Sequence, residues 1–254
     1  MNPSHQQVPH SDASTLALDL ARKISRGDMR PGERLPSERV LSAQSGLSRQ
    51  SVRKAISALV TAEVVSIKAG RGAASGSFVR SNLVPIALLD PNREPPSFSE
   101  VGQILEARRL FEPPVALFAS IRMDERDYDD INDVLGMQRK ANDLHSFRSL
   151  DSRFHLAIAK ATHNDVVYQQ MVSLMRELEI ARHVLPVDSS EQEIENTLDM
   201  HSQTLEAISS RDPDRISEVM SRHLAMMEQA WEGVSARKFS AHAQRLGFTI
   251  SGDV

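Results

Sequence analysis

Four prolines between Ser81 and Ser97 divide this chain of 254 residues into two parts. They are Pro85, Pro91, Pro95 and Pro96. Proline has no backbone N–H and its ring clashes with the preceding turn, so no helix is expected to survive at this density of proline. We therefore predict a linker at 81–98, and the length of the chain suits two domains better than one.

Composition excludes several classes of protein. There is no cysteine, so disulfide bonds are impossible and a metal site has to use His, Asp or Glu side chains. No apolar run approaches the ~20 residues that span a bilayer, so no membrane partner is expected. Residues 1–12 lack the basic start and apolar core of a secretory signal and are typical of a disordered arm. We expect a cytoplasmic protein, with a loose tail at 238–254.

Charge is distributed unevenly along the chain. From Ser14 to Arg80 there are twelve Lys and Arg residues against five Asp and Glu residues, a net charge of +7, whereas the whole chain carries −4. A basic segment on an acidic body is typical of a protein whose first part binds a polyanion. A chance imbalance explains the charge alone equally well, so the segment needs a second line of evidence.

Residues 13–80 have the pattern of a winged helix-turn-helix. A first helix is expected at 15–25 and a second at about 37–46, joined by a turn at Pro31-Gly32. Ser48 is a good N-cap for a third helix. A Gly-rich loop then joins two short β-like runs into a hairpin, which would form the wing. These two strands are predicted at 64–67 and 77–79.

The third predicted helix leaves a basic face free. Its apolar residues recur at helical spacing and form one stripe, and Arg49, Gln50 and Arg53 lie on or near the opposite face. Arg and Gln are the side chains that pair with guanine and adenine edges in the major groove. The arrangement favours DNA binding, and the alternative is a solvated basic face on an ordinary three-helix domain. The stripe consists of Val52, Ala55, Ile56, Leu59 and Val60.

Three motifs of this segment resemble the GntR family of bacterial transcription factors in order and spacing. They are PGERLPSER at 31–39, SRQSVRKA at 48–55 and GSFV at 76–79. The resemblance implies a DNA-binding winged helix-turn-helix whose contacts to DNA come from the arginines of the first two motifs and from a wing glycine. The candidate DNA-binding residues are Arg39, Ser48, Arg49, Gln50, Arg53 and Gly70.

Residues 99–237 follow a helical pattern interrupted by short polar breaks, which predicts an all-α bundle of six or seven helices. The fold class is therefore mainly α, with a winged helix-turn-helix joined to a helical bundle. Two chains are expected to pair as a homodimer, because two-fold symmetry matches a palindromic operator in double-stranded DNA.

Four residues of the helical part suggest a metal site. Asp151 and His155 are four apart, so a helix places both on one face, and an Asp/His pair at this spacing can chelate a divalent ion. A helical Asp beside a His is also common without metal. His201 and His223 lie among apolar residues, where a buried His needs a partner, and satisfied core histidines would explain them as well.

As a set, these residues resemble the FCD ligand-binding domain of the FadR-type branch of the GntR family, over roughly residues 100–232. The resemblance implies that Asp151, His155, His201 and His223 bind a divalent metal ion, with Zn²⁺, Ni²⁺ and Mn²⁺ all acceptable. It also implies an effector, a small carboxylate, held by Arg108. Asn164 is a further candidate effector contact, although a helix cap explains it at least as well.

Three functions are compatible with these residues. The preferred one is a DNA-binding regulator, expected to be a repressor, whose operator affinity responds to the acid bound at the metal. A metal-dependent hydrolase or lyase at the Asp/His site is the first alternative. The sequence has no HExxH motif, no nucleophile motif and no phosphate loop, so no enzyme is expected. A regulator with a purely structural metal is the second alternative.

Overall fold

The computed structural model describes residues 12–70, 75–185, 187 and 190–235. It divides into two compact units between Arg93 and Glu94, inside the segment predicted as a linker. The predicted tail, and all but the last residue of the predicted arm, lie outside the described residues. None of the helices in the described part is long and apolar enough to cross a membrane.

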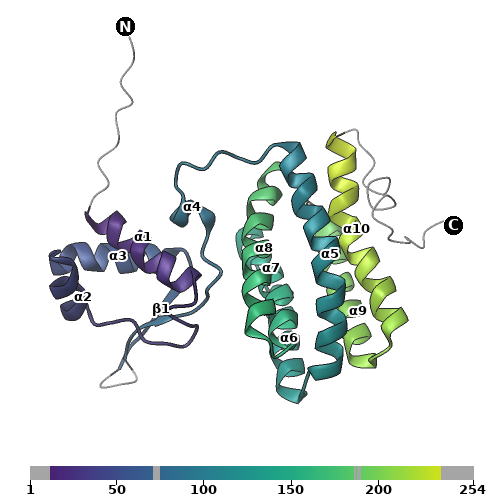
Figure 1. Cartoon of the computed structure of the whole chain (residues 1–254), viewed down its shortest axis with the longest axis horizontal. Coiled ribbons are helices and arrows are strands. Elements are labelled where there is room, and N and C mark those ends of the chain that lie inside the picture. The colour runs from purple at the N-terminus through teal and green to yellow at the C-terminus, as the bar shows by residue number, and fades with distance from the viewer. Residues whose placement is uncertain (1–11, 71–74, 186, 188–189, 236–254) are drawn as a thin grey trace, which may run out of the picture. The chain divides into compact units, whose positions relative to one another are not determined.

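The first unit contains the predicted three helices followed by a two-stranded antiparallel sheet (Figure 1). Val65 pairs with Val79 at one end of the sheet, and Lys68 pairs with Gly76 at the other. The predicted winged helix-turn-helix is therefore confirmed. The elements are α1 (Asp12–Ser25), α2 (Glu38–Ser45), α3 (Arg49–Thr61), β1 (Val65–Lys68) and β2 (Gly76–Val79).

Local sequence explains where the two central helices begin and end. The Ser37 hydroxyl accepts the backbone N–H of Val40 at the start of α2, and Gly46 ends the helix with a φ of 72°, which glycine adopts without strain. The Ser48 hydroxyl accepts the N–H of Ser51 at 3.1 Å and starts α3. The apolar stripe of α3 is buried against α1, so the basic face points outward.

The predicted linker is wrong in one respect, because it contains a short helix, α4 (Ile86–Leu89). The helix begins directly after Pro85 and ends before Pro91, so that neither proline occupies its interior. Val84 is buried in the core of the first unit, and the side chains of α4 pack against the same core. The first part of the predicted linker therefore belongs structurally to the first unit.

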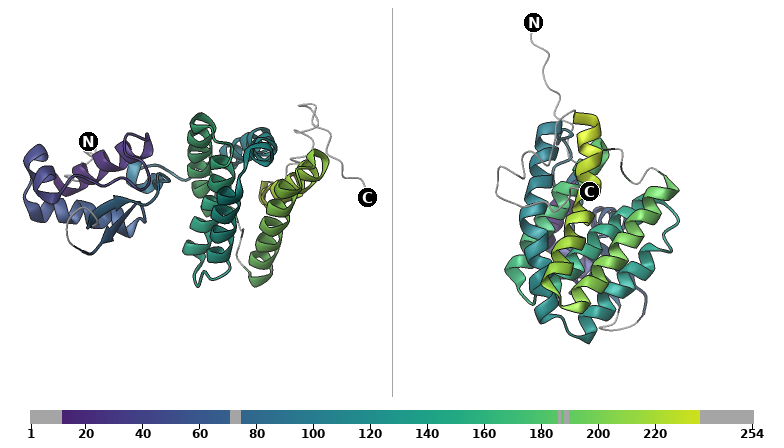
Figure 2. Two further views of the ribbon diagram at one scale, coloured as in Figure 1. Left: turned by 90° about the horizontal axis from the view of Figure 1, so that it is seen from below. Right: turned by 90° about the vertical axis from the view of Figure 1, so that its right-hand side faces the viewer.

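The second unit is an all-α bundle of six helices in the described part of the chain, which confirms the predicted architecture (Figures 1 and 2). Helix α10 packs along α5 and α9, and α7 packs against α5, α6 and α8. The helices are α5 (Phe98–Arg122), α6 (Glu125–Gln138), α7 (Leu144–Lys160), α8 (Asp165–Val184), α9 (Glu191–Ser210) and α10 (Pro213–Ser235).

Close packing fixes α10 on α5. The indole N–H of Trp231 donates to the carbonyl oxygen of Phe98 at 2.7 Å, and the ring lies over Gly102. A Cβ at Gly102 would be only 2.9 Å from Cζ2 of Trp231, so glycine is needed for this approach. Since α10 carries His223 and α5 carries Arg108, the contact also sets the positions of two candidate site residues.

Candidate functional site

The outward face of α3, together with Arg39 on α2, presents four of the predicted DNA-binding residues to solvent. Arg39, Arg49, Gln50 and Arg53 are all exposed. Nε of Arg53 donates to the carboxylate of Glu38 on α2 at 2.8 Å, yet the Arg53 side chain stays 69% exposed. The ion pair orients Arg53 without burying it, so its guanidinium is still accessible to an anionic partner.

Two of the predicted DNA-binding residues, Ser48 and Gly70, also have a structural role. Ser48 is the N-cap of α3, so its hydroxyl is already engaged with the backbone. Gly70 is exposed two residues after the end of β1 and has a φ of 149°, a conformation that other residues rarely adopt. The described structure thus gives both residues a role in shaping the DNA-binding surface, whether or not they touch DNA.

A basic groove beside the wing was not predicted from the sequence. It is lined by Arg34, Arg53 and Lys68, among others, and its wall includes Gly76. A Cβ at Gly76 would lie 2.8 Å from Nε of Arg34, so glycine lets this arginine lie across the strand. Glu38 also lines the groove and pairs with Arg53, so the three cations leave it with a net positive charge, which suits a phosphate backbone.

In the second unit, three buried imidazoles meet although they come from three different helices. His155 lies on α7, His201 on α9 and His223 on α10. Their ring centroids are 4.9 to 5.6 Å apart, and each ring offers a nitrogen within 4.8 Å of a nitrogen of the other two. The structure therefore brings these three predicted ligands together.

Hydrogen bonds at the outer edge of each ring determine which nitrogen carries the proton. Nδ1 of His155 lies 2.8 Å from the Glu112 carboxylate, and Nδ1 of His201 lies 2.8 Å from Oε1 of Gln138. Both partner oxygens only accept, so both imidazoles carry their proton on Nδ1. In a neutral ring with this tautomer, Nε2 is the nitrogen with the lone pair that can bind a cation.

His223 follows the same pattern through a hydroxyl group. Oγ1 of Thr204 donates to the carbonyl oxygen of Met200 at 2.8 Å and lies 3.1 Å from Nδ1 of His223. Because the hydroxyl proton is used on Met200, Nδ1 of His223 must be the donor. Burial lowers the pKa of His223 and of His201, which favours the neutral rings that bind cations.

The donor set fits a divalent cation. Nε2 of His155 and Nε2 of His201 are buried and lack a hydrogen-bond partner among the described residues. Asp151 lies at the edge of the cluster, with Oδ1 3.4 Å from Nε2 of His201 and Oδ2 3.9 Å from Nε2 of His155. Several acceptors that converge without a proton between them are costly to bury, and a shared cation would satisfy them.

Two ion pairs surround the cluster. Arg182, on α8, pairs with Asp151 and also donates to the carbonyl oxygen of Arg148 at 3.2 Å. Although burial opposes ionisation, the Arg182 guanidinium holds the pKa of Asp151 well below its usual range. Nε of Arg108 donates to Glu112 at 2.5 Å, and despite burial this guanidinium keeps the pKa of Glu112 well below its ordinary value.

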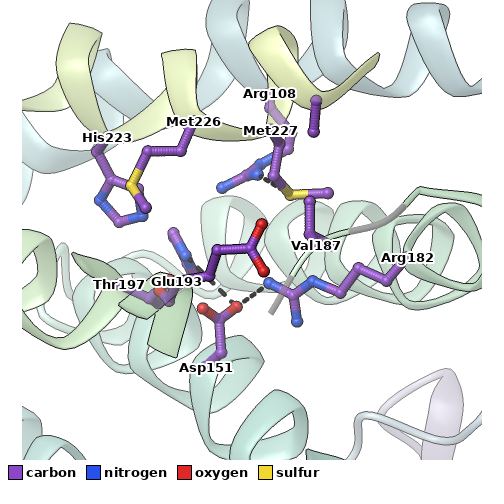
Figure 3. A pocket seen from close by; sticks show the side chains of 11 residues that line it. Arg108, Asp151, Arg182, Val187, Glu193, Thr197, His223, Met226 and Met227 are labelled. Atoms are coloured by element: carbon purple, nitrogen blue, oxygen red, sulfur yellow. Dashed lines mark hydrogen bonds and ion pairs between the residues drawn. The ribbon is translucent and has the colours of Figure 1, made fainter. Parts of the chain in front are cut away.

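A cavity of about 90 Å³ opens next to the imidazoles (Figure 3). Both buried arginines reach it, and two methionines of α10 supply an apolar wall. Such a mixture of charged and apolar surface suits a small polar ligand with a carbon skeleton. The cavity is lined by Arg108, Asp151, His155, Arg182, Val187, Glu193, Thr197, His223, Met226, Met227 and Ala230.

Asn164 does not belong to this cavity. Its side chain caps α8 by accepting the backbone N–H groups of Val166 and Val167 at 3.0 and 3.3 Å, and the residue is exposed. The suggestion of an effector contact is therefore corrected in favour of the helix cap. The sequence alone had left both explanations open, because an Asn before a helix suits either role.

Sequence reasoning missed four residues around the cluster. The pairing of Arg108 with Glu112 was detectable, since residues four apart share a helix face. No sequence signal pointed to Gln138 or Arg182, because each approaches the cluster from another helix. Thr204 shares α9 with His201, but its hydroxyl contacts His223 on α10, a pairing that the sequence does not show.

Replacing Gln138 by Leu is expected to lower the affinity for a divalent ion about 10- to 100-fold, because the Nδ1 of His201 loses the acceptor that orients its ring. The amide nitrogen of Gln138 is buried without a hydrogen-bond partner among the described residues, so an apolar side chain of similar size is tolerated there. Titration of Zn²⁺ against a competing chelator measures the affinity. The exposed Gln192→Leu is the control and should match the wild type.

Comparisons with known proteins agree with both units. The family model "Bacterial regulatory proteins, gntR family" matches residues 13–74, and the "FCD domain" model matches residues 103–226. The Exu regulon transcriptional regulator of Escherichia coli (strain K12) is 30% identical over 222 residues, which cover 82% of this chain and 80% of that protein.

Other relatives are similar over the same extent. The HTH-type transcriptional regulator LutR of Bacillus subtilis (strain 168) is 28% identical, with 83% of this chain and 96% of the relative covered. The HTH-type transcriptional repressor NanR of Cronobacter sakazakii (strain ATCC BAA-894) is 27% identical, with coverage of 87% and 86%. Among solved structures, a putative transcriptional regulator GntR from Rhodococcus sp. RHA1 has 20% identity and a TM-score of 0.48, covering 87% of this chain and 98% of its own.

Proposed function

Because this chain belongs to the GntR family of bacterial regulatory proteins and carries an FCD domain, we propose that it is a repressor whose affinity for its operator is controlled by a small carboxylic acid. It is a transcription regulator by family, and its first unit is the DNA-binding part. Beyond the family, we propose that the protein represses transcription and that its ligand is a carboxylic acid. One relative is named a transcriptional repressor, which supports repression.

One observation supports the ligand site: three buried imidazoles bring nitrogens within 4.8 Å of one another beside a cavity, and Nε2 of His155 and of His201 has no hydrogen-bond partner among the described residues. His155, His201 and His223 would hold a divalent ion such as Zn²⁺, Ni²⁺ or Mn²⁺, with Asp151 as the fourth ligand. Such an ion supplies a positive site for a carboxylate. Arg108 lines the same cavity and offers a guanidinium to the acid.

A homodimer is the second part of the proposal, supported by an apolar stripe on the outer face of α5. Exposed side chains recur there at intervals of three and four residues, with Phe118 53% and Ile121 72% exposed. A stripe of this kind on a helix is typical of a surface that packs against another protein. Its members are Ala107, Leu110, Pro114, Phe118 and Ile121.

The test uses the full-length protein loaded with Zn²⁺, whose mass by light scattering should be twice that of one chain. A panel of small acids is screened for a rise in the midpoint of thermal unfolding. Each acid that binds is then added to the protein on DNA from upstream of its own gene. Anisotropy of the labelled DNA should show a fall in affinity of about 5- to 150-fold, as expected for allosteric coupling.

The outcomes separate the alternatives. An acid that binds but leaves DNA affinity unchanged would refute ligand control. If chelation lowers thermal stability and leaves the response to acids intact, the metal is structural. Consumption of the acid during the assay would instead indicate the metal-dependent enzyme.

A further inference from the structure

Arg182 and a metal ion would share one carboxylate, that of Asp151. The guanidinium of Arg182 pairs with Oδ2 of Asp151, as the dashed line in Figure 3 shows. The same oxygen lies 3.9 Å from Nε2 of His155, and Oδ1 lies 3.4 Å from Nε2 of His201. Asp151 therefore contacts a permanent cation while it faces two of the nitrogens that would bind the ion.

The protein itself holds Arg182 in this position. Its side chain is only 5% exposed, and Nη1 donates to the carbonyl oxygen of Arg148 on α7 at 3.2 Å. Arg148 and Asp151 lie on the same helix, so both contacts of the guanidinium come from α7. Burial and these two contacts keep a positive charge next to the imidazole cluster.

We propose that Arg182 takes the place of the metal ion beside Asp151 when the ion is absent, and weakens the binding of the ion when it is present. This role rests on the proposed function, since it assumes a divalent ion at the imidazole cluster. It goes further because it makes the ion an exchangeable ligand, whose affinity is set by a residue that does not bind it.

Coulomb's law gives the sign of the effect. The attraction between Arg182 and Asp151 stabilises the protein with or without the ion, whereas repulsion between Arg182 and the ion acts only when the ion is bound. Removing the positive charge should therefore strengthen ion binding. If Arg182 only oriented Asp151 as a ligand, its removal would instead lower the affinity about 10- to 100-fold. The two roles thus predict changes of opposite sign.

The same pair matters for the metal-free protein. A buried carboxylate that loses its counter-charge is strongly destabilising, and Arg182 supplies that counter-charge to Asp151 without an ion. The helical unit is therefore expected to stay folded without the ion, unlike a structural zinc site, which folds only with its metal. Occupancy of the site can then follow the concentration of the free ion.

Arg182→Gln tests the sign, because it removes the charge and keeps a polar side chain beside Asp151. The affinity for Zn²⁺ is measured on the full-length protein by competition with a chelator, without any added acid. It is expected to rise at least about tenfold. The midpoint of thermal unfolding of the metal-free variant should lie at least about 5 °C below that of the wild type. Added Zn²⁺ should then raise the midpoint more in the variant.

Two further variants separate charge from general damage. Arg182→Lys keeps the positive charge, so its affinity for Zn²⁺ should stay close to that of the wild type. Arg109→Gln breaks a different buried pair, with Glu228, in which both side chains are at most 10% exposed. It should also lower the midpoint of thermal unfolding, yet leave the affinity for Zn²⁺ unchanged.

Three results would overturn this role: an equal or lower affinity for Zn²⁺ in Arg182→Gln, an equal gain in Arg182→Lys, or an equal gain in Arg109→Gln. If Arg182→Gln is unfolded without the ion, refolding on addition of Zn²⁺ would support the role, and failure to refold in excess Zn²⁺ would also overturn it. In all these cases the wild type still binds Zn²⁺, so the proposed function would stand. A wild type that binds no Zn²⁺, or that binds it equally well after His201→Gln, would count against the imidazole site itself.

Discussion

Replacing Arg49 by Ala is expected to lower the affinity for the operator at least about 30-fold, since a bidentate contact to a base contributes ~1–3 kcal/mol and the proposed homodimer would make it twice. Arg49 is exposed in the first turn of α3, and the helix is fixed by burial of its opposite face. The substitution therefore removes a contact to DNA without disturbing the core.

The measurement needs an operator, which selection from random DNA with the wild-type protein provides. Binding of this site is then followed by anisotropy at one fixed salt concentration, because phosphate contacts make the affinity salt-dependent. Arg22→Ala removes an equal charge from an exposed position on α1 and is the control. If the two variants lose affinity equally, Arg49 acts only through charge and the proposed base contact is wrong.

The fold was predictable where a residue's neighbours in sequence are also its neighbours in space. Ser37, Gly46 and Ser48 mark the ends of α2 and α3 through backbone groups no more than four residues away. The apolar stripe of α3 likewise depends only on helical periodicity.

Proline predicted the helices less reliably, because its effect depends on where in the helix it lies. Pro85 precedes α4 and fits there, although the density of proline around it had argued against any helix. Conversely, Pro113 and Pro114 lie inside α5, which continues for 25 residues. They withdraw two backbone donors and crowd the preceding turn, and the packing of α5 against α8 and α10 offsets that cost.

The sequence predicted the ligand residues of the candidate site but not the residues that surround them and pair with them. Resemblance named the Asp and the three His residues, and Arg108 beside them. It could not show that Gln138 fixes the proton of His201, or that Arg182 neutralises Asp151. These partners come from α6 and α8, and only the packing of the bundle brings them to the cluster. The surroundings of the predicted ligands are consequently a property of the fold.

Replacing Glu112 by Gln is expected to lower the free energy of unfolding by ~3–5 kcal/mol at pH 7, because it leaves Arg108 buried without a counter-charge. The amide would also turn an N–H donor toward either Arg108 or His155, both of which donate to this carboxylate now. A loss of this size is a large part of the ~5–15 kcal/mol that stabilises a typical protein. Urea denaturation of the metal-free protein measures it.

The pH dependence of this loss of stability shows whether the lost charge or lost packing causes it. Because the folded structure lowers the pKa of Glu112 from its ordinary value of 4.5, the ionised carboxylate stabilises the protein fully above that pH and progressively less below it. The difference between wild type and Glu112→Gln should therefore be constant from pH 7 to about pH 5 and shrink as the pH falls further. Glu218→Gln, at a side chain 69% exposed, should cost almost nothing at any pH. A difference that persists undiminished at pH 4 would mean that lost packing, and not the lost charge, destabilises the variant.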